Sequence, residues 1–135
     1  MTDGDGARRP VRGLPVPRLE SVRSAGAMSF HTTTVDDRGR IGVLAPLREL
    51  GWSPGYVLSC RIADGVIAVS PSTSGGGHRI GRRGYLRIPA PLRHRCRLAP
   101  GSRVLVVAHC GTPLLEIHPA ASVEAMLRHR LLSPG

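Results

Sequence analysis

Arginine is the residue type whose number and positions in this chain indicate chemistry. All 19 basic residues of the 135-residue chain are arginines, against nine acidic residues, and the formal net charge is +10. Residues 79–119 hold eight arginines and one acid, Glu116, and no acid occurs from Gly65 to Leu115. A field of one sign over such a length attracts a polyanion, and nucleic acid is the usual one. The alternative is a solvated basic surface that keeps the protein soluble.

An internal repeat must position these arginines. Two segments, Val35 to Pro71 and Ile80 to Pro119, carry the same turn and helix signals in the same order. Gly39 aligns with Gly84, Pro46-Leu47-Arg48 with Pro91-Leu92-Arg93, and Pro54-Gly55 with Pro100-Gly101. Neither copy is long enough to bury a core alone, so the two copies are expected to fold together.

Each copy predicts a strand, a tight turn, a second strand, one or two helical turns and a hairpin. In the first copy Gly39 supplies the positive φ of the turn, Pro46 begins the helical turns and Gly51 ends them. The predicted strands and short helices are Thr32–Val35, Arg40–Val43, Pro46–Leu50, Val57–Ile62 and Val66–Val69, then Tyr85–Ile88, Pro91–Arg95, Val104–Val107 and Leu114–Ile117. Asp64-Gly65 is the first hairpin turn, and Trp52 is expected to be a core residue beside the first helical turns.

The domain organisation predicted along the chain has five parts. They are a disordered basic arm (1–30), a first repeat (31–71), a Ser/Gly linker (72–78), a second repeat (79–119), and a C-terminal helix and tail (120–135). In the last part, Ser122 is the expected N-cap of a helix through Leu132, with Val123, Met126, Leu127 and Leu131 on one side. Met1 and Met28 are alternative translation starts.

No apolar run approaches the roughly 20 residues that cross a bilayer, and the N-terminus has no signal-peptide core. A cytoplasmic protein without a membrane partner is therefore expected. The three cysteines, Cys60, Cys96 and Cys110, form no CxxC pair or disulfide framework, as in a reducing compartment. Cys60 and Cys96 are expected to be small core residues, and Cys110 is expected in a turn.

Enzymatic and metal-dependent functions lack a motif in this sequence. Four histidines lie near the cysteines in sequence, but no ligand pair has zinc-finger spacing, so no metal or cofactor is expected. The histidines are His78, His94, His109 and His118. A thiol enzyme would need an orienting acid, and the second half of the chain offers only Glu116. We therefore expect a non-enzymatic protein.

The ordered motifs resemble the AbrB/MazE/SpoVT family of DNA-binding transition-state regulators and antitoxins, which are swapped-hairpin barrels. The resemblance spans Val35 to Pro119 and rests on Asp36 to Ile41, Pro46-Leu47-Arg48, Pro54-Gly55 and the strands around Asp64-Gly65. Two copies in one chain are similar to the MraZ arrangement, in which both halves build one barrel. The D-x-x-x-R motif of that arrangement fits Asp36 to Arg40, whereas the second copy has Gly81 and Tyr85 there. A degenerate tandem AbrB-like protein is therefore favoured over a true MraZ.

The resemblance implies a mostly β fold: two ββαββ repeats forming one pseudo-twofold swapped-hairpin barrel, plus a C-terminal helix. It implies sequence-specific binding of double-stranded DNA by paired turns at one end of the barrel, in a transcriptional regulator. Asp36 and Asp37 would orient the arginines or the turn. The expected DNA-binding residues are Arg38, Arg40, Arg82, Arg83, Arg87, Arg93 and Arg95, with Arg97 a further phosphate contact.

The same resemblance implies an alternative function as the antitoxin of a toxin–antitoxin pair. In that case the C-terminal helix, from Ser122 to Leu132, would lay its apolar side in a groove of a toxin protein. Two further roles remain open for this helix, namely packing on the barrel of its own chain and forming a homo-oligomer.

Overall fold

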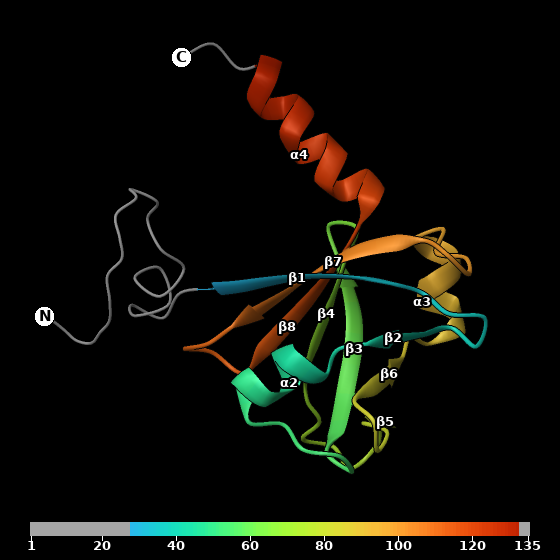
Figure 1. Ribbon diagram of the computed structural model, residues 1–135, viewed down its shortest axis with the longest axis vertical. Helices are drawn as coiled ribbons and strands as arrows, with labels where there is room; N and C mark the ends of the chain where they lie inside the picture. The colour runs from blue at the N-terminus through green and yellow to red at the C-terminus, as the bar shows by residue number, and fades with distance from the viewer. Residues whose placement is uncertain (1–27, 133–135) are drawn as a thin grey trace, which may run out of the picture.

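Eight strands and three helices follow one another in the computed structural model, which describes residues 28–132 (Figure 1). The first repeat contains β1 (Met28–Thr34), β2 (Arg40–Gly42), α2 (Leu44–Leu50), β3 (Val57–Ala63) and β4 (Val66–Pro71). The second repeat contains β5 (His78–Arg79), β6 (Tyr85–Arg87), α3 (Ala90–Arg95), β7 (Arg103–His109) and β8 (Leu114–Pro119), and α4 (Ala120–Leu132) follows. The mostly β fold with a C-terminal helix is thus confirmed, and both repeats have the same order of elements.

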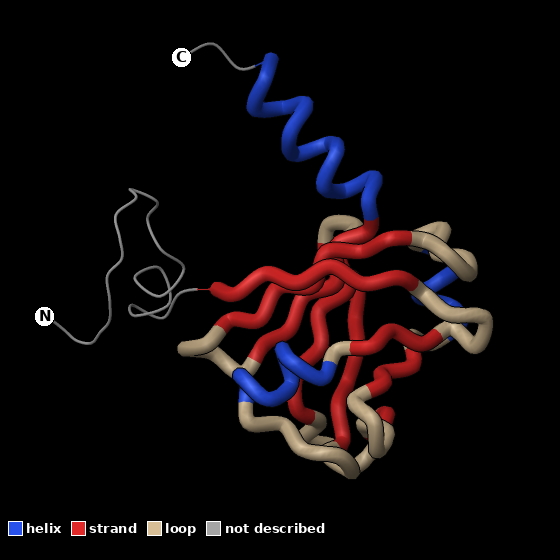
Figure 2. The backbone as a smooth tube through the Cα atoms, viewed as in Figure 1, coloured by secondary structure: helices blue, strands red, loops and turns tan. Residues whose placement is uncertain are grey.

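The strands form a six-stranded antiparallel sheet in the order β1-β7-β8-β4-β3-β5 and a separate two-stranded ribbon of β2 and β6. The large sheet is not closed, because β1 and β5 remain at its opposite edges. The strand pairing therefore does not show the predicted closed barrel. The ribbon lies beside this open sheet (Figure 2), and it also joins the two repeats, because β2 belongs to the first and β6 to the second.

The two repeats exchange their first strands. In the first repeat β1 pairs along its whole length with β7 of the second repeat, and β5 of the second repeat pairs with β3 of the first. Between these pairs, β4 and β8 join the repeats directly, with Ile67 opposite Ile117 and Val69 opposite Leu115. Because each copy completes the sheet of the other, the expectation that the copies fold together is confirmed.

One hydrophobic core is shared by both repeats. Alternate residues of the sheet face inward, among them Leu58 and Ile67 from the first repeat and Val106 and Ile117 from the second, all 0% exposed. The ribbon closes over this core with Ile41 opposite Leu86, and both are fully buried. Their neighbours along the strands therefore face outward, as a period of two requires.

The burial of Trp52, Cys60 and Cys96 agrees with the prediction that they are core residues. Trp52 is 5% exposed and stacks on Tyr56 with the ring centroids 6.3 Å apart. Cys60 and Cys96 pack against the core, and burial raises the pKa of the Cys60 thiol to about 11. A thiol in that state is a poor nucleophile, which fits a packing role.

The element boundaries differ most from the prediction at β1, α2 and α4, and the short strand β5 was not predicted. β1 begins at Met28, so residues 28–30 of the predicted arm belong to a strand that β7 holds; residues 1–27 lie outside the described part. α2 begins at Leu44, two residues before Pro46, and α4 begins at Ala120, directly after β8. Ser122 is not the N-cap of α4, because it is the third residue of the helix. Its hydroxyl donates to the carbonyl oxygen of Gly65 at 3.2 Å.

The helix α4 extends away from the sheet (Figure 1) and has no buried residue. Met126 is 51% exposed, Leu127 56% and Leu131 83%. Only the first turn of α4 packs on the body of its own chain, where Ser122 and Val123 are half-buried; the rest of the helix does not. An isolated helix of 13 residues has only marginal stability in water. Because α4 has no buried residue, contacts within the described chain add little to that stability.

Candidate nucleic-acid interface

Two tight turns, one from each repeat, flank the ribbon and have matching backbone geometry. In the first, the amide of Gly39 donates to Asp36 at 3.1 Å, and in the second the amide of Gly84 donates to Gly81 at 3.1 Å. The φ angles of Gly39 and Gly84 are +74° and +77°, which explains the glycine at each turn. Each turn also bonds across to the other repeat, through Val43 N–H to Gly84 (2.8 Å) and Ile88 N–H to Gly39 (2.9 Å).

An open hollow of about 490 Å³ lies over the ribbon and between these turns. Six arginines line it, together with Gly81 and Tyr85, and no acidic residue does. The arginines are Arg38, Arg40, Arg79, Arg82, Arg83 and Arg87. Five of them are predicted site residues, so the fold brings together arginines that lie up to 49 residues apart in the sequence. We call this surface the arginine hollow.

Asp36 organises the first turn and one of its arginines. One carboxylate oxygen accepts the backbone N–H groups of Arg38 (2.9 Å) and Arg40 (2.8 Å), and the other accepts Nε of Arg40 at 2.8 Å. The hydrogen bond from the Arg40 amide is the largest cause that lowers the pKa of Asp36, and the Arg40 guanidinium adds to it. Asp36 is therefore ionised at neutral pH, and its predicted role in orienting the turn is confirmed. Asp37 is exposed beside it.

The remaining arginines of the hollow differ from Arg40 in having no acidic partner among the residues that the structure describes. Within residues 28–132, the only arginine–carboxylate ion pair is the one between Arg40 and Asp36. Arg38, Arg82, Arg83 and Arg87 are all exposed. Their charges are consequently not neutralised by the described part of the protein, and each guanidinium keeps five donors for an anionic ligand.

Arg93 and Arg95 lie outside the arginine hollow, on α3. Arg93 is half-buried, donates Nε to the carbonyl oxygen of Ile88 at 2.9 Å, and packs its guanidinium against Gly39. It therefore fastens α3 to the first turn. Arg95 is exposed at the end of α3, as is Arg97 just beyond it.

Arg79 also lines the hollow but is not among the predicted DNA-binding residues. It lies on β5 and donates Nη1 to the carbonyl oxygen of Gly55 at 3.0 Å. Its place within the acid-free stretch before the second turn is the signal that could have identified it.

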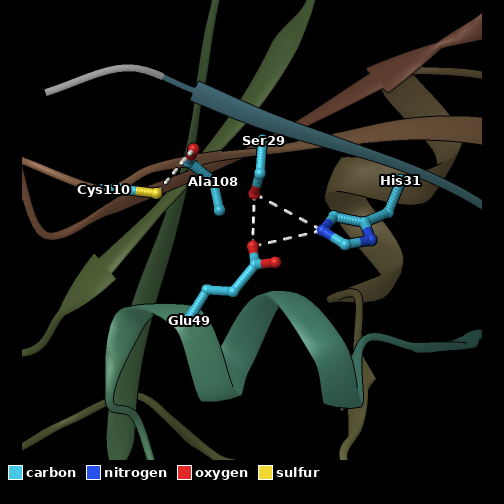
Figure 3. A network of polar contacts seen from close by, with 5 residues as sticks. All are labelled: Ser29, His31, Glu49, Ala108 and Cys110. Atoms are coloured by element: carbon cyan, nitrogen blue, oxygen red, sulfur yellow. Dashed lines mark hydrogen bonds and ion pairs between the residues drawn. The ribbon is translucent and has the colours of Figure 1, made fainter. Parts of the chain in front are cut away.

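A second polar cluster joins β1 to α2 (Figure 3). Ser29 donates its hydroxyl to Oε1 of Glu49, and Nε2 of His31 lies 3.2 Å from the same oxygen and 3.4 Å from the Ser29 hydroxyl. In a catalytic triad the two ring nitrogens of histidine contact the serine and the acid separately. Here one nitrogen faces both, and Ser29 is 8% exposed. The cluster therefore pins the strand to the helix and does not activate the serine.

Other candidate sites have no structural support in the described residues. Among residues 28–132, no three His, Cys, Asp or Glu side chains are grouped so that they could hold a metal ion. Cys110 is exposed in the turn between β7 and β8, as predicted. Within the same residues, none of the helices has the length and apolar character needed to cross a membrane.

Comparison with known proteins gives no independent assignment. No protein-family model matches the chain, and no curated protein matches it significantly.

Proposed function

We propose that this protein is a sequence-specific transcriptional regulator that binds double-stranded DNA through the arginine hollow and has no enzymatic activity. The observation that carries this proposal is the gathering of six arginines from both repeats around one hollow without a carboxylate among its lining residues. An idle solvated surface does not require arginines from distant parts of the sequence to converge. Duplex DNA presents a dense row of phosphates to such a surface.

The shape of the surface is compatible with duplex binding. A two-stranded ribbon fits the major groove of B-DNA, and arginine forks onto phosphate oxygens or onto O6 and N7 of guanine. In the ribbon, Arg40 lies directly opposite Arg87 on the outward face, and the two turns extend the positive surface on either side. The phosphate contacts would position the ribbon, and contacts to base edges would provide the specificity.

The proposal includes membership of the AbrB/MazE/SpoVT family and the swapped-hairpin architecture. The exchange of β1 and β5 between the repeats supports this assignment, since each hairpin-bearing repeat completes its partner. A cytoplasmic location is part of the same proposal, because a transcriptional regulator must reach DNA.

Fluorescence anisotropy with a labelled duplex tests this function. If about five arginines engage phosphates, affinity should fall on the order of a thousandfold between roughly 50 and 200 mM salt. The double variant R82A/R83A should bind more weakly and have a smaller salt slope. The matched control is R128A/R130A, which removes the same charge from exposed positions of α4. A flat salt response, or equal losses for the two double variants, would show that the hollow is not the binding surface.

A second candidate function is that of an antitoxin that covers a toxin with α4. The observation in its favour is the exposure of Met126, Leu127, Leu131 and Leu132, which are 51–83% exposed. This function requires a small ribonuclease-like toxin gene beside this one, and co-expression with the product of such a gene tests it: the wild type should restore growth, and L127D/L131D should not. Restoration by both proteins would exclude α4 as the toxin-binding segment. Sedimentation velocity on the same two proteins shows whether α4 instead forms a homo-oligomer.

A further inference from the structure

The two turns of the arginine hollow occupy equivalent positions in the backbone. In the ribbon, Arg40 is opposite Arg87 and Gly42 is opposite Tyr85, with Ile41 and Leu86 at the centre. Exchanging residues 36–42 with residues 81–87 reproduces this register and the paired hydrogen bonds of the two turns. Ligand atoms that approach either turn therefore meet the same arrangement of main chain.

The side chains on this equivalent backbone carry different charges. The first turn has two aspartates and two arginines in residues 36–42, whereas the second has three arginines and no acid in residues 81–87. The equivalent positions, first turn then second, are Asp36 and Gly81, Asp37 and Arg82, Arg38 and Arg83, Arg40 and Tyr85, and Gly42 and Arg87. The formal charge is thus zero on one side of the hollow and +3 on the other.

The arginine side chains of the two turns also differ in how firmly they are held. Arg40 is held by Asp36 at 2.8 Å and lies over the ring of Tyr85, with its guanidinium carbon 4.5 Å from the ring centroid. In the second turn, Arg82, Arg83 and Arg87 are exposed and have no ion-pair partner within residues 28–132. A phosphate at the first turn approaches two carboxylates, and a phosphate at the second turn meets only cations.

We propose that the protein binds a duplex site whose two halves differ, in one orientation, with the second turn making the stronger contacts. This inference rests on the proposed DNA-binding function. A palindromic site offers identical groups to both turns, and two unlike turns cannot both match them. A site with unlike halves matches each turn separately, and binding in the reverse orientation places the weaker half-site on the stronger turn.

Arg38 and Arg83 provide a matched test, because they are equivalent and exposed and neither has an ion-pair partner within residues 28–132. The duplex used is one selected from a random pool with the full-length wild type. We expect R83Q to weaken binding on the order of tenfold or more, the loss typical of a good arginine contact. We expect R38Q to weaken it by less than about threefold, because neighbouring carboxylates already oppose a phosphate there. Equal losses from the two variants, both with wild-type melting temperature, would overturn the proposal.

The orientation of the bound DNA provides an independent measurement. Ser53 and Ala99 are exposed, equivalent residues next to the Pro-Gly turns, and Gly55 contacts Arg79 of the hollow. Each is replaced by cysteine in a C60A/C96A/C110S background, because Cys60 and Cys96 are free and only half-buried, and is labelled with an iron–EDTA cleavage reagent. On the selected duplex, each tether should cut predominantly at a single end, and the two tethers should cut opposite ends. Equal cutting at both ends by each tether would overturn the proposal.

The two failures are distinguishable in these experiments. If the wild type binds no duplex, or binds it without salt dependence, the proposed function fails and this inference fails with it. If the wild type binds tightly but R38Q and R83Q lose equal affinity and each tether cuts both ends, the proposed DNA-binding function is retained. The inference that the two turns have unequal roles is then wrong.

Discussion

The guanidinium of Arg40 lies over the ring of Tyr85, with 4.5 Å between its central carbon and the ring centroid. The two residues are equivalent positions of different repeats, and Arg40 reaches diagonally across the ribbon to Tyr85, whose ring lies beside Gly42. A cation–π contact of this kind joins the repeats on the outward face, opposite the buried pair Ile41 and Leu86. Together with the ion pair to Asp36, it keeps one arginine of the hollow in a fixed position.

Loss of the Tyr85 ring should reduce stability. We expect Y85L to lower the free energy of unfolding by roughly 0.5–1 kcal/mol relative to Y85F, since Phe retains the aromatic face and Leu does not. Urea denaturation followed by the fluorescence of Trp52 measures this difference. Equal stabilities of Y85L and Y85F would show that the stacking on Arg40 contributes nothing.

Neutralising Asp36 should strengthen DNA binding. In D36N the amide oxygen still accepts the backbone N–H groups of Arg38 and Arg40, but the negative charge beside the hollow is removed. We expect duplex affinity at low salt to rise roughly threefold, because an exposed charge is screened by solvent and its removal has a modest effect. Anisotropy titration measures the effect.

The control for D36N is D64N, which removes an equal charge at the tip of the β3–β4 hairpin, at a positive φ of 53° that asparagine tolerates. If D64N strengthens binding as much as D36N does, the effect is one of net charge and not of position. The difference between D36N and wild type should vanish only at a pH below the usual pKa of aspartate, because the pKa of Asp36 is lowered by its hydrogen bonds with Arg40.

The second turn should not tolerate a side chain at Gly84. A Cβ there would lie 2.8 Å from Cβ of Leu44 and 2.9 Å from its Cα, at a φ of +77°. We expect G84A to destabilise the protein by roughly 2–3 kcal/mol, from backbone strain and displacement of α2. G51A is the matched control, with a φ of +75° and no atom within 4 Å of the added Cβ, so it reports the strain alone. Equal melting temperatures for the two variants would contradict the close contact with Leu44.

Glu116 should make stability depend on pH in the acidic range. Its Oε1 lies 3.1 Å from Nε2 of both His109 and His118. Burial alone would raise the pKa of Glu116, but the two histidines outweigh burial and lower it. A carboxylate with a lowered pKa stabilises the folded state above its unfolded pKa, and that contribution is lost as the pH falls through the folded pKa.

The measurement for Glu116 compares wild type with E116Q by thermal or urea unfolding from about pH 6 down to about pH 3. We expect the wild type to be more stable by about 1 kcal/mol near pH 6 and the two curves to converge as the pH falls. Parallel curves across this range would show that the histidine contacts contribute no pH-dependent stability.

Local features of the fold were predictable because they depend on few residues. The turns at Gly39, Gly84 and Asp64-Gly65, the hairpin strands and the burial of Trp52 follow from positive φ, alternation and size. The limits of β1 were not predictable in this way, because Met28–Phe30 has strand structure through its pairing with β7, about 80 residues away. The start of α4 at Ala120 likewise depends on β8 leading directly into it.

The amino-acid sequence alone determined that the chain carries two copies of one module and that its positive charge is concentrated in the second copy. Tertiary structure decided which arginines act together. Arg79, on β5, lines the hollow, whereas Arg93 lies outside it and packs against the first turn. It also decided that Arg40 is paired with Asp36, whereas Arg82 and Arg83 have no carboxylate partner in the described part of the chain. Charge and turn chemistry are properties of neighbours along the chain, whereas the partner of a long side chain depends on which strands the sheet brings together.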